Sequence, residues 1–336
     1  MKDPYHPNKG PFLRDLVSGD RIIGYYVLRS KQLEPFRDPS RGNFLTLVLS
    51  DRSGQLIARV WENAEMAYED VLEGEIIKLD GETESYLERT QIRILRLRPA
   101  DPNEYDMRDM LPSSERDPEE MLGELKTFIE TIQDQHLSAL VNSFFEDDDF
   151  LSLFIQAPAA RRVHHAYLHG LIEHTLEILV LAQTTLQIYP QINPDLLYAG
   201  ILLHDIGKVR EYSWELDINY TNEGRLLGHV VMANEMITDA LKSLPEFPED
   251  LSLRLRHMLL SHHGRYEWGS PRRPKTLEAI ALHHLENTSA QLNRFNSLLS
   301  NRQPDKDWTE YDRLLRRQLY GSSEDELSIE ESSQLS

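Results

Sequence analysis

The chain of 336 residues contains no cysteine, which excludes disulfide bonds and thiolate metal sites. Any metal ion must therefore be bound by histidine, aspartate or glutamate, side chains that suit divalent transition metals. Long apolar runs are also missing, because the longest, such as residues 196–203, fall far short of the ~20 residues that cross a bilayer. The first residues, MKDPYHPNKGPF, lack the apolar stretch of a secretory signal. We therefore expect a cytoplasmic protein that does not span a membrane.

Basic residues are scarce, and the formal net charge is −20. A nucleic-acid-binding protein normally has a basic surface, so the net charge argues against that class. The acidic residues are, however, concentrated: residues 321–336 hold five acids and no base, and residues 101–120 hold eight acids and two bases. Residues 1–60 instead hold ten Lys or Arg and six Asp or Glu. The charge therefore does not exclude a nucleic acid, and the tail 321–336 is expected to be disordered because it has little to bury.

Five segments between residues 15 and 99 have the composition of β-strands, being rich in β-branched and aromatic residues. They cover residues 21–30, 43–51, 55–63, 74–86 and 90–99, with turn signals such as DRSG between them. Five short strands this close together favour a small barrel, with an OB-fold as the best single interpretation. A generic β-sandwich or an SH3-like barrel fits the same pattern. We assign residues 1–100 to this domain and expect it to bind nucleic acid.

The pattern becomes helical after an acidic, proline-containing linker. Asp117 suits an N-cap and Pro118 the first helical position, and apolar residues recur at helical spacing from there to about residue 302. We expect the linker and connecting helices over 101–157, an all-α bundle over 158–305 and a last amphipathic helix over 306–320. That helix could pack against a second copy of the chain. The predicted class is multidomain α+β, a five-stranded barrel followed by a helical bundle.

Most of the thirteen histidines lie in the helical region, at or near the ends of apolar segments. The most specific element is HDIGK at residues 204–208, where the apolar run YAGILL ends in a histidine and an aspartate. A buried aspartate is unfavourable unless it is paired, and a metal ion would supply the positive charge. The other members of the series are His174, His229, His262-His263, and His283-His284 beside Glu286. Judged on the pattern alone, hydrogen-bonded core histidines and a metal site are about equally well supported.

Several motifs together resemble the HD superfamily of metal-dependent phosphohydrolases: HTLEI, LLHDIGKVREY, GRLLGHV and LLSHHGRYEWGSPRRPKTLEAIALHHLEN. Within that superfamily the chain is most similar to the YhaM-like 3′→5′ exoribonucleases, which join an N-terminal OB-fold to an HD domain. The stretch PAARRVHHAYLHGLIEHT also resembles that family where its first HD helix begins. The resemblance spans roughly residues 15–320 and is strongest over 158–295.

The resemblance implies a set of metal ligands. For one ion they are His174, His204 and Asp205, and for a second ion His229, His262 and His263. It also implies a ligand at Glu286, where the superfamily has an aspartate, and Ser289 stands where the family has a further acid. The implied cofactors are two divalent metal ions, with Mn²⁺ favoured and Fe, Co, Ni or Zn also suited to such ligands.

The resemblance further implies hydrolysis of single-stranded RNA, and of single-stranded DNA as a second substrate, to nucleoside monophosphates by a metal-activated hydroxide. Asp205 would orient this nucleophile, and Lys208 would reach the phosphate, although a solvated helix-end lysine fits its position nearly as well. The barrel would stack bases on aromatic side chains above basic ones. The expected substrate contacts are Arg161, His164, His165, Arg272, Arg273 and Lys275 near the metal site, and Tyr25, Lys31 and Phe36 in the barrel.

Two other functions fit the sequence. One is an HD phosphohydrolase of small nucleotides with a regulatory barrel, and release of nucleoside monophosphates from oligomers would distinguish it from the exonuclease. The other is a nucleic-acid-binding protein whose metal site has decayed, an alternative that rests on Glu286 and Ser289. Against it, the remaining ligand-type side chains are all retained, and costly polar groups are seldom kept together in a decayed site.

Overall fold

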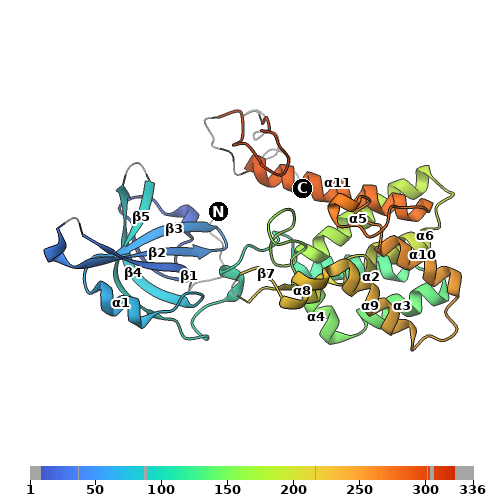
Figure 1. Cartoon of the computed structure of the whole chain (residues 1–336), viewed down its shortest axis with the longest axis horizontal. Helices are drawn as coiled ribbons and strands as arrows, with labels where there is room; N and C mark the ends of the chain where they lie inside the picture. The colour runs from blue at the N-terminus through green and yellow to red at the C-terminus, as the bar shows by residue number, and fades with distance from the viewer. Residues whose placement is uncertain are drawn as a thin grey trace. The chain divides into compact units, whose positions relative to one another are not determined.

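The computed structural model describes residues 9–36, 38–86, 89–215, 217–300, 302 and 306–321, and Figure 1 shows the course of the chain. The chain divides into two compact units: residues up to 115 together with residues 213–219, and the remainder. The predicted acidic tail lies outside the described residues from position 322 onward.

The first unit is built on a closed five-stranded barrel (Figure 1, blue to cyan). Its strands are β1 (Arg21–Pro35), β2 (Asn43–Asp51), β3 (Gly54–Val60), β4 (Ile76–Tyr86) and β5 (Arg89–Pro99). They follow the order β1-β2-β3-β5-β4, and β4 pairs back onto β1. All neighbours are antiparallel except β3 and β5, which are parallel. The predicted five-stranded, OB-like barrel is thereby confirmed.

Alternate side chains of the strands fill the barrel. On β2, Leu45, Leu47 and Leu49 are fully buried while the residues between Leu45 and Leu49 are partly exposed, because successive side chains of a strand point to opposite faces. The short helix α1 (Ala64–Asp70) follows β3 and adds Ala64 to the same core. The inner face of the barrel is thus an apolar core, which leaves the outer face for ligands.

Part of the segment predicted as an acidic linker packs on the barrel instead. Met110 is fully buried against Tyr25 and Val27 of β1, and Tyr105 and Met107 pack on the same cluster. The segment has few apolar residues among its acids, and this composition is typical of a linker. Those few apolar residues nevertheless anchor the segment to the barrel.

The second unit consists of helices, and the short pair β6 (Tyr212–Ser213) and β7 (Asn219–Tyr220) stands where the chain leaves this unit at residue 213 and returns to it at residue 220. Its helices are α2 (Pro118–Glu130), α3 (Gln135–Phe145), α4 (Asp148–Gln156), α5 (Gly170–Ile188), α6 (Pro194–Leu203), α7 (Lys208–Glu211), α8 (Asn222–Leu227), α9 (His229–Leu241), α10 (Glu249–Leu259) and α11 (Leu277–Ser300). Asp117 caps α2 as predicted, since its carboxylate accepts hydrogen bonds from two backbone N–H groups. Helices α5 and α6 pack against each other and against α2 and α11. No helix within the described ranges is long and apolar enough to cross a membrane.

The helix predicted over residues 306–320 is wrong. The segment instead forms an irregular turn with isolated antiparallel bridges between Trp308 and Tyr320 and between Asp312 and Arg317. The Asp312 carboxylate accepts hydrogen bonds from the backbone N–H groups of Leu314 and Leu315 and pairs with Arg294 of α11. An aspartate that bonds its own backbone in this way competes with the helical hydrogen-bond pattern.

Candidate metal centre

The HDIGK segment lies at the buried end of α6. Asn193 caps this helix by accepting a hydrogen bond from the backbone N–H of Leu196, and Pro194 is its first residue. The helix ends at Leu203, and the next two residues, the C-cap His204 and then Asp205, have exposed fractions of 0% and 2%. A carboxylate held at such a depth requires positively charged or hydrogen-bonding partners.

Gly207 allows this turn to pack closely against the start of α9. A Cβ at this position would lie 2.2 Å from the carbonyl oxygen of His229 and 2.8 Å from the backbone nitrogen of Ala233. Backbone atoms cannot rotate away as a side chain can, so any larger residue would push α9 outward. The glycine of the motif therefore positions His229 beside Asp205.

The carboxylate of Asp205 lies between two groups of imidazoles. Its Oδ2 is 3.2 Å from Nε2 of His204 and 3.9 Å from Nε2 of His174. Its Oδ1 is 3.5 Å from Nε2 of His229 and 3.7 Å from Nε2 of His262. Two groups of three residues each have their ligand atoms within 4.8 Å of one another. The first group is His174, His204 and Asp205, and the second group is His229, His262 and His263. One carboxylate oxygen thus faces each group, as in a ligand that bridges two ions.

Hydrogen bonds of Nδ1 orient all five imidazoles. The acceptors are Ser289 Oγ for His174 (2.9 Å), Ile201 O for His204 (2.6 Å), Glu211 Oε2 for His229 (2.9 Å), Leu259 O for His262 (2.7 Å) and Trp268 O for His263 (2.8 Å). For His204, His262 and His263 the acceptor is a carbonyl oxygen, which can only accept, so Nδ1 carries a proton and in the neutral ring Nε2 keeps its lone pair. Metal-binding histidines are oriented in this way by a second layer of acceptors.

Five buried polar atoms at this centre have no hydrogen-bond partner among the described residues. They are Nε2 of His174, His204 and His262 and both carboxylate oxygens of Asp205. Each buried polar group left unsatisfied costs about 1–3 kcal/mol. The ammonium of Lys208 lies 2.6 Å from Asp205 Oδ2 as an ion pair, although its alignment is not that of a hydrogen bond. Divalent cations fit these atoms, because they would accept lone pairs that make no hydrogen bond within the described part of the chain.

The pKa shifts agree with a metal-binding role. Burial lowers the pKa of His174 and His262 well below the usual value and lowers that of His263 to about 4. These rings are therefore neutral at pH 7, the form that binds a metal. Burial is the largest single influence on His204 and Asp205 and disfavours charge on both, but the opposing interactions together outweigh it. Asp205 raises the pKa of His204, and the charges of His204 and Lys208 hold the pKa of Asp205 well below its usual value.

Glu286 lies close to the centre but outside its ligand groups. Burial, and then the negative charge of Asp205, raises the pKa of Glu286 to about 7. Its carboxylate belongs to none of the ligand groups found among the described residues. The role of Glu286 as a ligand therefore stays a prediction.

Two residues that the sequence did not single out support the imidazoles. Glu177 is one helical turn beyond His174 and accepts a hydrogen bond from Ser289 (2.5 Å), which accepts one from His174. Glu211 is one turn beyond Lys208 and accepts hydrogen bonds from both Nδ1 and the backbone N–H of His229. For Glu177, an acid one turn beyond a ligand on the same helix face is the sequence signal that would have found it. Glu211 has no such signal, because it contacts His229, which is 18 residues further along the chain.

The structure brings His164 and His165 to the edge of the centre. Both rings have their centroids 5.1 Å from that of His174, and the three residues form a third group of candidate ligands. His165 is buried, has a φ of +45° and lies with Nε2 3.1 Å from Glu177 Oε1. The guanidinium of Arg161 lies 6.0 Å from the ring of Tyr220.

In the barrel, two of the three predicted RNA contacts are engaged elsewhere. Tyr25 is 5% exposed because residues 100–110 cover it, and its hydroxyl donates to Glu104. The ammonium of Lys31 donates to the carbonyl oxygens of Tyr68 and Val71. Neither side chain is available to a nucleobase or a phosphate in this structure.

Phe36, the third predicted barrel contact, belongs to an aromatic cluster on the outer face. Its ring centroid is 5.2 Å from that of Phe44 and 5.9 Å from that of Trp61, and all three residues are partly exposed. The guanidinium of Arg41 lies 4.3 Å from the Phe36 ring, and that of Arg59 lies 5.6 Å from the Trp61 ring. We call Phe36, Phe44 and Trp61 the barrel aromatic cluster.

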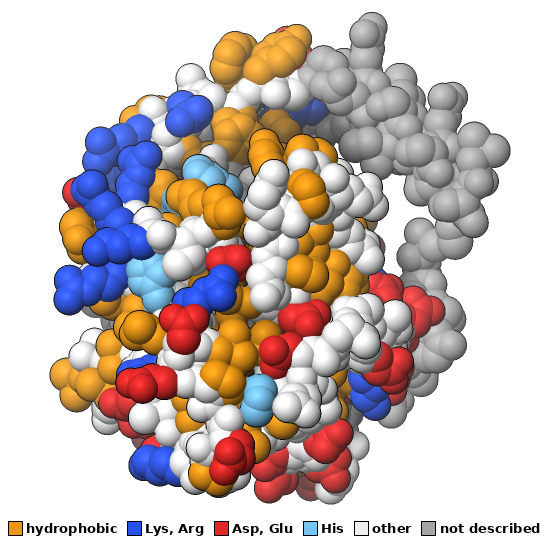
Figure 2. Space-filling model, turned by 90° about the vertical axis from the view of Figure 1, so that its right-hand side faces the viewer, with side chains coloured by type: hydrophobic (Ala, Val, Ile, Leu, Met, Phe, Trp, Pro, Cys, Tyr) orange, Lys and Arg blue, Asp and Glu red, His pale blue; other side chains and the backbone are white. Residues whose placement is uncertain are grey.

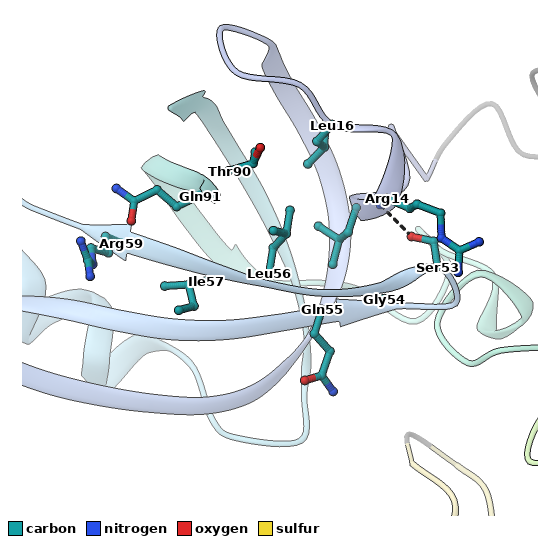
Figure 3. Close-up of a pocket in the computed structure, with 11 residues that line it drawn as sticks. Arg14, Leu16, Ser53, Gly54, Gln55, Leu56, Ile57, Arg59, Thr90 and Gln91 are labelled. Carbon is teal, nitrogen blue, oxygen red and sulfur yellow. Dashed lines mark hydrogen bonds between the residues drawn. The ribbon is translucent and has the colours of Figure 1, made fainter. Parts of the chain in front are cut away.

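A hollow of about 890 Å³ adjoins this face of the barrel (Figure 3). Arg59 and Gln91 lie at one end of it, and Arg14 and Ser53 lie at the other, where the backbone N–H of Arg14 donates to Ser53 Oγ (3.0 Å). None of its lining residues belongs to a candidate ligand group. The hollow is thus a binding surface at most, and the chemistry belongs to the helical unit.

Comparison with known proteins supports this division. A model of the HD domain matches residues 171–291, which include both ligand groups. The fold and the site therefore define an HD-domain protein that also carries an OB-like barrel.

Three curated relatives define the family more closely. The chain is 34% identical over 289 residues to the 3′-5′ exoribonuclease YhaM of Shouchella clausii, covering 85% of this chain and 88% of that protein. It is 33% identical over 301 residues to the protein of that name from Bacillus subtilis and 35% identical over 303 residues to the one from Bacillus licheniformis, covering 88% of this chain and 92% of each relative. This chain belongs to the 3′-5′ exoribonuclease YhaM family, so the resemblance seen in the sequence is confirmed.

Proposed function

We propose that this protein is a metal-dependent 3′→5′ exoribonuclease that hydrolyses single-stranded RNA to nucleoside monophosphates. The observation that carries the proposal is the carboxylate of Asp205, with one oxygen facing each of two imidazole groups. The relatives named as 3′-5′ exoribonucleases support the direction of attack and the RNA substrate.

The two ligand groups would hold two divalent metal ions, for which we propose Mn²⁺. Ions in this position would polarise the phosphodiester and lower the pKa of a water molecule. The chain itself supplies the geometry, because Nδ1 hydrogen bonds fix each imidazole and Gly207 sets the approach of His229. Lys208 places a buried positive charge beside Asp205, where it can neutralise a phosphate oxygen of the strand.

We propose two surfaces for the strand. In the helical unit, Arg272, Arg273 and Lys275 are exposed in the loop that follows His262-His263 and would bind phosphates. In the first unit, the barrel aromatic cluster would stack bases beside Arg41 and Arg59. Neither surface reads a base edge, so single-stranded DNA would also bind, and the 2′-hydroxyl would have to be recognised elsewhere. The cytoplasmic location and self-association stay predictions.

The test is product identity. Purified full-length protein with Mn²⁺ and a 20-nucleotide single-stranded RNA should release nucleoside monophosphates, measured by chromatography. Asp205→Asn should abolish release, whereas Asp239→Asn should leave it unchanged, because Asp239 is exposed on α9 and pairs only with Lys242 among the described contacts. Release of oligonucleotides, or undiminished release by Asp205→Asn, would contradict the proposal.

A further inference from the structure

Two large aromatic side chains are exposed directly after the metal-ligand pair His262-His263. Tyr266 is 55% exposed and Trp268 is 46% exposed, and both lie in the short 3₁₀ helix η4 (Tyr266–Trp268). Keeping such rings in water sacrifices about 25 cal/mol for each Å² left unburied. Neighbouring exposed rings beside a reaction centre therefore point to a ligand that covers them.

Each ring has an arginine over it. The guanidinium of Arg265 lies 4.7 Å from the ring of Trp268, and that of Arg273 lies 5.2 Å from the ring of Tyr266. Residues 264–275 contain three arginines, one lysine and one glutamate, although the chain as a whole has a net charge of −20. In Figure 2 most Lys and Arg side chains of the face in view lie toward its upper left, with single ones elsewhere. Aromatic rings for bases beside cations for phosphates are the means by which proteins hold single-stranded nucleic acid.

The loop is connected directly to the metal centre. The carbonyl oxygen of Trp268 accepts the hydrogen bond from Nδ1 of His263 (2.8 Å), so the backbone that carries the exposed ring also orients a candidate ligand. Gly264 has a φ of +73°, and a Cβ there would lie 2.3 Å from the ring of His283. The loop thus turns sharply after His263 and returns to it, which places Trp268 beside the second imidazole group.

Internal hydrogen bonds hold the loop in this shape. The buried hydroxyl of Ser270 donates to the carbonyl oxygen of Arg272 (2.7 Å), and the backbone N–H of Arg272 donates to Leu260 O (3.1 Å). A cleft of about 460 Å³ lies within it, lined by Gly264, Arg265, Glu267, Trp268 and Arg273. This volume is in the range of small-ligand sites. A surface held before the ligand arrives loses less conformational entropy on binding.

We propose that Trp268, with Arg265 and the neighbouring Tyr266-Arg273 pair, is a base-stacking site for one nucleotide near the 3′ end of the RNA. The base of this nucleotide stacks on Trp268, and its phosphate binds Arg265 or Arg273. This inference rests on the proposed function for its substrate, and it adds that the enzyme requires a base at one defined position. A strand that presents only sugar and phosphate at that position is held less well.

The experiment combines variants with a modified substrate. Single abasic nucleotides are placed at successive positions from the 3′ end, and single-turnover rates with Mn²⁺ are measured for wild type and for Trp268→Ala. Stacking on one aromatic ring gives an expected loss of about 5- to 100-fold. In wild type, one abasic position should slow the reaction by that factor. Trp268→Ala should cleave intact RNA as slowly as wild type cleaves the abasic RNA, and the abasic nucleotide should not slow this variant further. Trp268→Phe should restore most of the rate.

Two controls separate stacking from damage to the metal centre. The backbone carbonyl of Trp268 is retained in the variant, so its Mn²⁺ affinity should equal that of wild type in calorimetry. Trp308→Ala removes another exposed tryptophan of the helical unit and should change neither rate nor affinity. The stacking site is refuted, while the exonuclease stands, if Trp268→Ala has no effect on the rate. It is refuted equally if the abasic nucleotide slows Trp268→Ala by the same factor as it slows wild type. If wild type cleaves no RNA but Trp268 and the base still determine RNA binding in EDTA, the proposed function fails and the stacking site stands.

Discussion

Replacing Ser289 with alanine should weaken metal binding although Ser289 is not a ligand in either group. Its buried hydroxyl accepts the hydrogen bond of His174 Nδ1 (2.9 Å) and donates to Glu177 Oε2 (2.5 Å). In Ser289→Ala the His174 N–H becomes a buried donor without an acceptor, whereas Glu177 is partly exposed and can turn to water. The expected loss of unfolding free energy is therefore that of one unsatisfied buried group, about 1–3 kcal/mol.

The effect on metal affinity follows from the orientation of the ring. Without Ser289 neither the tautomer nor the rotation of His174 is fixed, and losing such a support lowers metal affinity by about 10- to 100-fold. Mn²⁺ titration by calorimetry measures the affinity, and urea unfolding in EDTA measures the stability. Ser289→Thr keeps the hydroxyl and should recover most of the affinity.

Thr288→Ala is the matched control, because Thr288 is the adjacent, exposed residue and its hydroxyl bonds only the backbone of its own helix. It should change the Mn²⁺ affinity by less than about twofold, as surface substitutions are usually near neutral. Unchanged affinity in Ser289→Ala, or an equal loss in Thr288→Ala, would refute the reasoning.

Further predictions concern the backbone, pH, metal and barrel. Gly207→Ala should destabilise the protein by about 3 kcal/mol or more in urea unfolding, because the new Cβ meets backbone atoms of α9; a loss below 1 kcal/mol would contradict the packing argument. In EDTA the unfolded chain protonates the histidines of the two groups near pH 6.5, whereas burial keeps three of them neutral in the fold. Burial also lowers the pKa of His164, whereas the raised pKa values of His204 and Glu286 keep protons on the fold. On balance the unfolded chain binds more protons, so stability should fall as the pH is lowered from 6 to 5, and a flat profile would count against it. Mn²⁺ at 100 times its Kd should raise the unfolding free energy by about 2.7 kcal/mol, and no rise in melting temperature would count against a metal site. Trp61→Ala should weaken binding of a 20-nucleotide RNA in EDTA by about 5- to 100-fold, and equal affinity would remove the barrel aromatic cluster from the RNA surface.

The sequence predicts the fold wherever one strong periodic signal dominates. The five strands and the capped helix at Asp117 have such signals, in alternation and in cap chemistry. Residues 306–320 also alternate at helical spacing, but Asp312 bonds its own backbone and α11, and this tertiary context overrides the period. Tyr25 could not be placed from the sequence, because the residues that bury it belong to an acidic segment far along the chain.

For the metal centre, the sequence identifies the candidate ligands but not their arrangement. HDIGK and the later histidines are recognisable as types and spacings, yet only the structure shows that Asp205 faces two groups. The supporting residues Glu177 and Glu211 escape a search for histidines because they contact the far side of the rings. Trp268 was not singled out either, since its position depends on the turn at Gly264.

The central claim is that the two imidazole groups around Asp205 hold the metal that drives RNA degradation from the 3′ end. The most direct measurement follows a 5′-labelled single-stranded RNA with purified full-length protein, with Mn²⁺ or EDTA, alongside Asp205→Asn and Asp239→Asn. We predict a ladder that shortens from the 3′ end with Mn²⁺ in wild type and Asp239→Asn, and intact RNA in EDTA and with Asp205→Asn. A ladder that persists in EDTA or in a folded Asp205→Asn, or intact RNA with metal-loaded wild type, would contradict the account.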